Sequence, residues 1–454
     1  MKRIVWRCLA ASSMLLVTLA QAETRPQYGG TLHVAMRAAP MTLDPADRSE
    51  ESFGGRSITA LLFDTLVVMD DSGRAQPALA ETWQASRGNQ RWEFRLRQGV
   101  KFADGTPLTA NIMAASLRAA NPAWNVSSSG SSVIIELEVA DPELPAEVAL
   151  PRNAIAKKNA GDVIGTGPFY VIGWQAGKKL TLAANEEYWR GRAFLDDIEI
   201  EMGRNVRDQM TAFELRKADL IEVAPEQTHR FVQEGRGLTS SARIELLALV
   251  FSRDASSAQE KALRQALALS VERGSIRSVL LQGAGEPTGS LLPTWISGYG
   301  FVLPAATDLQ KAKQLRAEAR TVPNWTIGYD GNDPLLRLIA ERVALNAKDA
   351  GLSLQPSSGS TTDLRVVRMA IASGNPWVAM NDLLGQIGMP APKDKSGSME
   401  ELYTSEQAAV ASGRVIPLFH LPQSYLSASD LKDWKVQADG SWDLTRAWLE
   451  NSKP

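Results

Sequence analysis

The apolar residues of the chain recur with two periods, one typical of strands and one typical of helices. Apolar residues alternate with polar or small ones over 32–36 and over 92–96, which indicates strands with one buried face. Similar runs lie at 134–139 and 198–202. The sequence Asp-Asp-Ser-Gly at 70–73 separates two apolar runs and predicts a hairpin turn. We therefore expect several half-buried strands in the first half of the chain.

Helical patterns are clearest in the second half. Ser257 and Glu260 have the spacing of a capping box, in which each side chain satisfies a free amide at the helix start. Apolar residues recur every four positions after them, which predicts a helix that runs on to Gly283. Residues 333–351 begin with Asp-Pro and end in Gly, and they predict a second helix. The serine-rich stretch 127–132 is expected to be a surface loop. Strands and long helices in succession predict an α/β architecture.

The composition excludes several classes of protein. With 44% hydrophobic and 22% charged residues, the 454-residue chain is globular, and ~100–200 residues per domain suggests two to four domains. The 49 Lys and Arg are balanced by 51 Asp and Glu, so no basic surplus favours nucleic acid. One cysteine, Cys8, and three histidines argue against a disulfide framework and against a cysteine- or histidine-rich metal centre. We therefore expect no nucleic-acid partner, no metal and no cofactor.

The first 22 residues have the pattern of a secretory signal peptide. Lys2, Arg3 and Arg7 give a basic start, and an apolar stretch over 9–20 is too short to span a bilayer. A small-x-small cleavage site ends at Ala22. Because no other segment carries the ~18 apolar residues of a membrane helix, we expect an exported protein that does not insert into the membrane.

Motifs that carry catalysis are missing from the sequence. There is no Gly-x-Ser-x-Gly, no His-Glu-x-x-His and no Walker loop. Residues 165–168 begin like a dinucleotide fingerprint, but the proline at 168 cannot offer the amide such a loop uses. His33, His229 and His420 lie apart in the sequence, and each is more typical of a structural role. We therefore expect no enzyme and assign no catalytic residue.

Ten short motifs follow one another in a fixed order: Gly29-Gly30-Thr31-Leu32, Leu43-Asp44-Pro45-Ala46, Leu62-Phe63-Asp64-Thr65-Leu66, and residues 77–83, 92–99, 100–108, 165–169, 185–189, 264–267 and 416–420. In this order they resemble the family 5 periplasmic solute-binding proteins, the oligopeptide, dipeptide and nickel receptors of bacterial importers. The resemblance extends over nearly the whole chain after the signal peptide. Several motifs in the right order are a far more specific signal than any one of them alone.

The resemblance implies an α/β fold of two lobes with mixed sheets, joined by two crossover strands. Lobe 1 would take residues 23–250, with a trimmed insertion subdomain at about 67–164, and would be completed by 425–454. Lobe 2 would take 251–424. It further implies a periplasmic receptor, monomeric, that closes over a small organic molecule or a short or modified peptide and delivers it to an inner-membrane ABC importer.

The resemblance also bears on the ligand site. Peptide receptors of this family have a Trp followed three residues later by an aspartate that pairs with the peptide's free amine. Here Trp377 is followed by Met380, and the nearest acid is Asp382, two residues further on. A buried ammonium without its partner is costly, so Met380 argues against recognition of a free amino terminus. Trp377, Met380, Asn381 and Asp382 are all candidate ligand residues.

Two arginines and two aromatic residues are further candidates. Arg365 and Arg368 lie where oligopeptide receptors place cleft arginines, and they could bind a carboxylate or phosphate through a bidentate fork. Alternatively, they lie on the solvated face of a strand. Trp295 and Tyr299 follow a turn-rich segment, and flat side chains with a polar group suit a pocket. Core packing is the alternative role for both.

The loop over 39–43 would border the cleft by the same template, so Met41 and Thr42 complete the candidate ligand residues. Scattered histidines make nickel the least expected ligand of this family. Two other functions stay open, namely a secreted hydrolase and a periplasmic sensor or chaperone on the same scaffold. A hydrolase needs a nucleophile beside a base, and only His420 is a candidate for that base.

Overall fold

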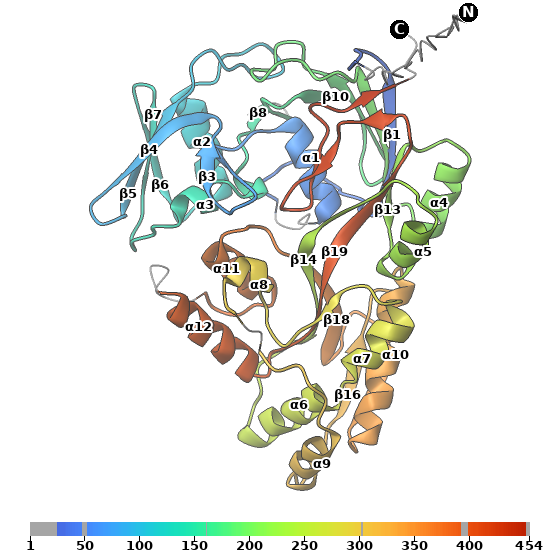
Figure 1. The fold of residues 1–454 in the computed structure, drawn as a ribbon. Helices are drawn as coiled ribbons and strands as arrows, with labels where there is room; N and C mark the ends of the chain where they lie inside the picture. Colours follow the sequence, from blue (N-terminus) through green and yellow to red (C-terminus); the bar gives the residue numbers. More distant parts are fainter. Residues whose placement is uncertain (1–24, 48–51, 160, 301–302, 392–397, 451–454) are drawn as a thin grey trace, which may run out of the picture.

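The computed structural model describes residues 25–47, 52–159, 161–300, 303–391 and 398–450, and the expected signal peptide lies outside them. The chain forms two lobes, one above the other, joined by the long strands β14 (Leu238–Phe251) and β19 (Val415–Ser427) (Figure 1). The expected two-lobed α/β fold with two crossover strands is therefore confirmed. Among the described residues no helix is long and apolar enough to cross a membrane.

One mixed sheet continues through both lobes. Its order is β10-β11-β12-β1-β13-β19-β14-β18-β16-β17, with β15 paired to β19 at the side. Strand β1 is parallel to β12 and β13. The crossover strands β14 and β19 are antiparallel to each other, β13 is antiparallel to β19, and β18 is antiparallel to β14. The other bounds are β1 Thr31–Ala35, β10 Phe169–Gln175, β11 Lys179–Ala184, β12 Asp197–Glu201, β13 Leu220–Val223, β15 Glu286–Pro287, β16 Asn324–Gly328, β17 Ser353–Ser357 and β18 Leu364–Ala370.

The crossover strands change partners halfway along. The end of β19 pairs with β13 in lobe 1, and the second half of β14 pairs with β18 in lobe 2. The register between β14 and β19 shifts on both sides of Arg243. We propose that the chain passes between the lobes around this irregularity, while the expected boundaries near 250 and 424 stay predictions.

Lobe 1 contains a main core and a separate subdomain. Helix α1 (Phe53–Leu62) packs with β1, β10, β11 and β12 in the main core. The subdomain is a four-stranded sheet of order β4-β5-β7-β6 covered by α2, with its own apolar core. Its bounds, with those of the remaining lobe 1 elements, are β2 Val67–Met69, β3 Ala75–Pro77, β4 Ala80–Ser86, β5 Arg91–Leu96, α2 Ala110–Ala120, β6 Asn125–Ser129, β7 Ser132–Glu136, α3 Leu144–Glu147, η2 Pro151–Asn153, β8 Lys157–Asn159, β9 Asp162–Ile164, α4 Val206–Glu214, η3 Pro225–Gln227, α5 Thr228–Gln233, β20 Leu431–Lys432, β21 Lys435–Val436, β22 Trp442–Asp443 and β23 Trp448–Leu449.

The alternating runs and the Asp-Asp-Ser-Gly hairpin are confirmed as strands and a turn, except that the strand predicted over 134–139 ends at Glu136. The loop expected over 127–132 is wrong for most of its length, because only residues 130–131 form a turn, and the others belong to the paired strands β6 and β7. Serine is a neutral strand former, and here pairing with the rest of the sheet decides its conformation.

Lobe 2 places helices on both faces of its part of the sheet, giving two apolar cores. Its helices are α6 Ala258–Ser270, α7 Arg273–Ser275, the π-helical turn η4 Ile276–Leu280, α8 Thr294–Ser297, α9 Leu309–Ala317, α10 Pro334–Asp349, α11 Pro376–Gln386 and α12 Met399–Ala411. The helix predicted over 333–351 is confirmed as α10, and Gly351 follows it with a φ of 77°.

The helix predicted to reach Gly283 ends at Ser270 instead. Val271 adopts an extended backbone and buries its side chain in the lobe 2 core. The chain then turns so that the buried Arg273 donates twice to the Pro417 carbonyl oxygen, from Nη2 at 2.7 Å and from Nε at 3.2 Å. Of the predicted capping box, Ser257 accepts from the Glu260 amide, but the Glu260 carboxylate binds other partners. Tertiary contacts therefore override the helical period.

Candidate functional site

The two lobes meet along a surface that we call the inter-lobe seam. Each polar contact across it joins a side chain of one lobe to a group of the other. Among the described residues these contacts include Arg37 with Asp333, Arg56 with the carbonyl oxygens of Ala370 and Ile371, Arg152 with Asp382, and Glu143 with Asn375. The residues involved are far apart in the sequence and are brought together only by the fold.

The pair between Arg152 and Asp382 is shorter than the other ion pair described across the seam, that of Arg37 with Asp333. Arg152 Nη1 lies 2.6 Å from Asp382 Oδ1, and the two side chains are only 9% and 5% exposed. Arg152 also pairs with Glu147 at 3.2 Å, and Gln386 donates to the second Asp382 oxygen at 3.0 Å. The turn η2 that carries Arg152 is held by Asn153, whose amide donates to the Glu147 carbonyl oxygen. A rigid turn therefore delivers the guanidinium to the opposite lobe.

Helix α11 presents one face to lobe 1 and another to the core of lobe 2. Val378 and Asp382, four residues apart, face lobe 1, whereas Trp377 and Met380 are buried in the lobe 2 core. The helix begins at Asn375, whose side-chain oxygen accepts from the amides of residues 377 and 378. The same side chain donates through its nitrogen to Glu143 of lobe 1. The cap of α11 is thus also a contact across the seam.

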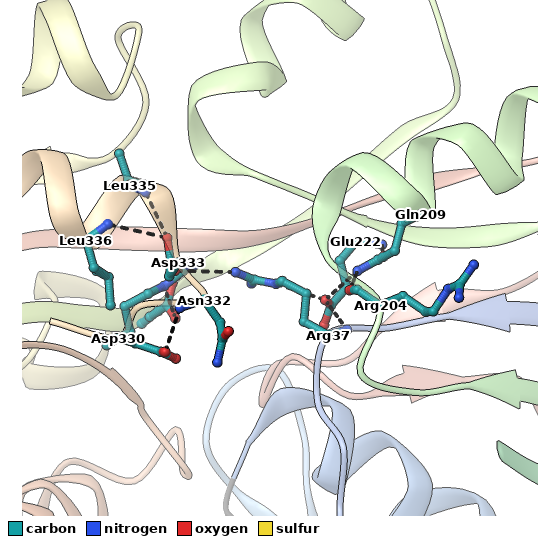
Figure 2. Close-up of polar contacts among 11 residues, drawn as sticks. Arg37, Arg204, Gln209, Glu222, Asp330, Asn332, Asp333, Leu335 and Leu336 are labelled. Carbon is teal, nitrogen blue, oxygen red and sulfur yellow. Dashed lines mark hydrogen bonds and ion pairs between the residues drawn. The ribbon is translucent and has the colours of Figure 1, made fainter. Parts of the chain in front are cut away.

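Asp333 combines the same two roles for α10. One carboxylate oxygen accepts from the amides of Leu335 and Leu336 and caps the helix. The other oxygen lies 3.6 Å from Arg37 Nη1, so the cap of a lobe 2 helix contacts lobe 1 (Figure 2). Arg37 in turn pairs with Glu222 of β13 at 3.0 Å.

A buried arginine supports Asp333 from within lobe 2. Arg368 binds Glu245 through two contacts of 2.8 and 2.7 Å and lies 3.3 Å from Asp333. Burial by itself lowers the pKa of the Arg368 guanidinium, but the two carboxylates outweigh it and hold that pKa above its ordinary value. Arg368 is therefore a permanent cation, engaged by Glu245 of the crossover strand β14 and by Asp333 of lobe 2.

Arg56 makes a different kind of contact. It lies on α1, is only 3% exposed, and donates to Ile371 at 2.9 Å and to Ala370 at 3.2 Å. Both acceptors are backbone carbonyl oxygens at the end of β18 in lobe 2. Within the described ranges no carboxylate lies within ion-pair distance of Arg56, and its guanidinium contacts these two dipoles and the ring of Phe53, 5.7 Å from the ring centroid.

Apolar and glycine contacts close the rest of the seam. Ala146 and Leu150 of lobe 1 pack against Ala372 and Val378 of lobe 2, with Met69 beside them. At the tip of the β2–β3 hairpin the backbone passes so close to lobe 2 that a Cβ at position 73 would lie 2.9 Å from the carbonyl oxygen of residue 374. Position 73 also has a φ of 71°, so glycine is required there for two reasons.

A pocket opens beside the seam, bounded by the loop after β1, by α1 and by η2. It encloses about 40 Å³, which accommodates a few water molecules but not a typical small-molecule ligand of ~300–1,000 Å³. Its lining consists of Pro40, Thr42, Leu43, Asp44, Pro45, Asp47, Gly55, Arg56, Ile58, Thr59, Pro151, Arg152 and Ala372. All of these residues except Ala372 belong to lobe 1.

The structure brings some of the sequence candidates to the seam. Thr42 lines the pocket, and Met41 beside it is 67% exposed. Asp382 lies in the seam and pairs with Arg152. Asn381 is the neighbour of Asp382 on α11, and both polar atoms of its carboxamide are buried without a hydrogen bond among the described residues.

Other candidates lie apart from the pocket. Trp295 is 40% exposed and donates from its indole to the carbonyl oxygen of Arg243 at 3.1 Å. Tyr299 packs edge-to-face on Tyr403, with 5.5 Å between ring centroids, and burial raises the pKa of the Tyr299 phenol. Arg365 donates to the carbonyl oxygen of residue 359 at 3.1 Å.

His420 lies inside lobe 2, on β19. It is 2% exposed, its Nε2 lies 3.0 Å from the Leu291 carbonyl oxygen, and burial lowers the pKa of its imidazole to about 4. Glu406 of α12 binds the same segment by accepting from the amides of Leu291 and Leu292, and burial raises its pKa to about 7. The two groups hold one loop, which is a structural role for both.

Sequence reasoning missed the arginines of lobe 1. Arg37, Arg56 and Arg152 stand outside every motif, and an arginine in a helix or turn is ordinary on a protein surface. A weak signal existed for Asp333 and Asn375, each of which precedes a proline and is thereby marked as a helix cap. No group of three or more His, Cys, Asp or Glu residues that could hold a metal ion occurs within the described ranges.

The model of the bacterial extracellular solute-binding proteins, family 5, matches residues 74–392, well over half of the chain. The nickel-binding protein NikA of Staphylococcus aureus is 24% identical over 316 residues, which cover 65% of this chain and 64% of that protein. The di/tripeptide-binding protein 2 of Pseudomonas aeruginosa is 26% identical over 371 residues, which cover 69% of this chain and 68% of that protein.

A solved structure has the same fold. The binding protein AgaA of A. tumefaciens, in complex with agropinic acid, superposes with a TM-score of 0.79 and 19% identity. The match covers 93% of this chain and 99% of that one. The chain spans just under two thirds of the length of the staphylococcal relative it matches in sequence. These matches agree with the motifs, the two lobes and the crossover strands, and the chain belongs to the bacterial extracellular solute-binding proteins, family 5.

Proposed function

We propose that this protein is a periplasmic receptor that closes its two lobes over a small organic molecule or a short or modified peptide. It acts as a monomer, delivers the solute to an inner-membrane ABC importer and performs no catalysis. The observation that carries the proposal is the seam, where charged and capping side chains of each lobe are directed at the other beside a pocket lined by Arg56 and Arg152.

The seam explains how a solute could control the conformation. A solute that touches both lobes has a higher affinity for the closed arrangement, so it shifts the population towards closure. The contacts across the seam add to that preference, because they exist only when the lobes meet. Their polar character keeps them reversible, since every group can be hydrated when the lobes separate.

The class of solute follows from the pocket more than from the relatives. The named relatives bind nickel, di- or tripeptides and agropinic acid, so family membership leaves the cargo open. Arg56 is a buried cation whose acceptors are dipoles, and it favours a solute with an anionic or carbonyl group at that end of the pocket. Thr42 and Thr59 offer neutral hydrogen bonds nearby.

The geometry of His420 gives no support to the hydrolase alternative. A general base needs an accessible ring nitrogen near a nucleophile, whereas His420 is buried in lobe 2 and contacts the backbone of Leu291. A sensor or chaperone would share the closing fold, and it would differ in lacking an importer as partner.

The test is native mass spectrometry of gently purified protein, combined with small-angle scattering before and after the solute is removed. The expected result is a bound mass lost on partial unfolding and refolding, and a smaller radius of gyration when that solute is returned. A solute that binds without compacting the protein would contradict closure, and turnover of the bound solute would contradict a receptor without catalysis.

A further inference from the structure

Asp382 is an unusual carboxylate for its surroundings. It lies on the face of α11 that meets lobe 1, and its side chain is 5% exposed. A buried carboxylate needs a cation or several hydrogen-bond donors, because desolvation otherwise costs several kcal/mol. Among the residues that the structure describes, its own lobe supplies one neutral donor, Gln386. The charge is therefore left to be neutralised from the other side of the seam.

The cation comes from the same chain. Arg152 enters from lobe 1 on the proline-initiated turn η2 and places a guanidinium nitrogen 2.6 Å from Asp382. Glu147 binds the other end of this guanidinium at 3.2 Å, so Arg152 lies between two carboxylates from opposite lobes. Arg152, though not Asp382, also lines the pocket, so a solute that enters the pocket would meet the guanidinium of the pair.

We propose that Asp382 is a cation-recognition group of the cleft and that Arg152 fills it from within the chain. Arg152 is then a specificity determinant that directs the receptor away from solutes with a primary ammonium or guanidinium group. This inference rests on the proposed function, since it assumes that solutes bind between the lobes.

The discrimination has a simple physical basis. An incoming cation must displace a guanidinium that is covalently tethered a few ångströms away and therefore has a high effective concentration. The displaced Arg152 loses its partner across the seam and becomes a second cation beside the first. Neutral or anionic solutes incur neither cost, which agrees with the position of Arg56 in the same pocket.

The experiment removes Arg152 and supplies a substitute for its side chain. Arg152→Ala leaves Asp382 and Glu147 facing a space of the size of the deleted side chain. We expect n-propylguanidinium to bind this variant at least tenfold more tightly than it binds the wild type, measured by isothermal titration calorimetry and by the rise in thermal midpoint. The matched control is Arg337→Ala, which breaks an exposed pair with Glu341 and should gain no binding.

A double variant identifies the group that binds the probe. Arg152→Ala combined with Asp382→Asn retains Glu147 but lacks the proposed recognition carboxylate, so the gained affinity should be lost. If Arg152→Ala does not fold, Arg152→Gln with methylguanidinium as probe answers the same question. Equal affinity of the single and double variants, or of the wild type and the single variant, overturns the proposal.

The outcome is separable from the test of the proposed function. A protein that carries no solute through purification can still gain affinity for n-propylguanidinium when Arg152 is removed. Conversely, a protein that compacts around a solute can lack this gain, and then only the role of Arg152 falls.

Discussion

Two buried ion pairs of this protein have the same N–O distance, but one lies within a single helix and the other joins the two lobes. Arg264 binds Glu260 at 2.6 Å within helix α6, four residues apart, with side chains 1% and 10% exposed. Arg152 binds Asp382 at 2.6 Å across the seam, with residues from different lobes. In every arrangement of the lobes the first pair stays together, whereas the second exists only when the lobes meet.

The location of each pair decides what its loss changes in the protein. When a partner is removed from a pair inside one lobe, the remaining charge stays buried, and the folded lobe bears the full cost. When a partner is removed across the seam, the lobes can separate and water can solvate the remaining charge. The first kind of pair therefore controls the stability of a lobe, and the second controls the balance between open and closed arrangements.

The largest effect is expected from Arg264→Met. Arg264 also donates to the carbonyl oxygens of Arg253 and Gly413 and lies over the ring of Phe251 at 3.9 Å. Loss of the cation removes three charged hydrogen bonds, while Arg253 and Ser256 still bind Glu260, so lobe 2 should lose about 3–5 kcal/mol of stability. Urea unfolding with hydrogen exchange of α6 measures this loss, and Arg337→Met is the surface control. Equal losses for Arg264→Met and Arg337→Met would contradict the view that the pair of Arg264 with Glu260 controls the stability of lobe 2.

Glu406→Gln tests a buried charge of lobe 2 that has no cationic partner among the described residues. Its pKa rises from 4.5 to about 7 in the fold, so it favours folding below pH 4.5, and this contribution is lost as the pH rises through 7. Gln keeps an acceptor for Leu291 and Leu292 but cannot ionise. The variant should therefore be more stable than wild type at pH 8 by about 3 kcal/mol, with the gap vanishing near pH 4.5.

The pH series has an internal control. His420 has a lowered pKa and contributes an opposite slope between pH 4 and 6.5, but it is present in both proteins and cancels in their difference. Thermal unfolding at pH 4.5, 6, 7 and 8 measures the difference. A gap that does not depend on pH would contradict the assignment to Glu406.

Arg56→Met should act on the seam and not on the lobes. The variant keeps an apolar stem on α1 but loses two charged hydrogen bonds to Ile371 and Ala370. Such bonds contribute about 1.5–3 kcal/mol each, so the open arrangement should gain at least tenfold in population. Fluorescence energy transfer between dyes on the two lobes measures it. A large loss of unfolding stability with no change in the distance between the lobes would show that Arg56, like Arg264, stabilises a lobe and does not control closure.

The smallest effect on solute binding is expected from His420→Ala. Because His420 contacts a backbone oxygen inside lobe 2, its removal should change the affinity for the retained solute by no more than several-fold. Calorimetry with the solute identified by mass spectrometry checks this, with circular dichroism as the control for folding. Complete loss of solute binding in a folded variant would contradict a purely structural role for His420.

Much of the fold was predictable because local rules and tertiary contacts agree. The strand containing Trp92 and the helix after Asp333 were predicted because period, caps and glycine ends all indicate the same element. The helix beyond Ser270 and the loop at 127–132 were mispredicted where burial of Val271 or sheet pairing decides the conformation. Periodicity describes one element at a time and does not register such contacts.

The candidate site was predictable only in part, and the residues show why. Asp382 was named from its distance to Trp377, and the structure brings it to the seam. Arg152 was not named, because nothing within its own segment distinguishes it from a surface arginine. Asn375 and Asp333 cap helices through one atom and contact lobe 1 through another, and sequence reveals only the first of these roles.

The sequence by itself determined the family, the α/β class, the two lobes and the lack of a catalytic motif, because these depend on ordered motifs and on local periodicity. Only the tertiary structure decided which charges meet. Arg152 and Asp382 are 230 residues apart, and their pairing depends on how a turn in one lobe and a helix in the other are oriented. Local sequence carries no record of that orientation, which is set by the packing of two cores and by the strands that join them.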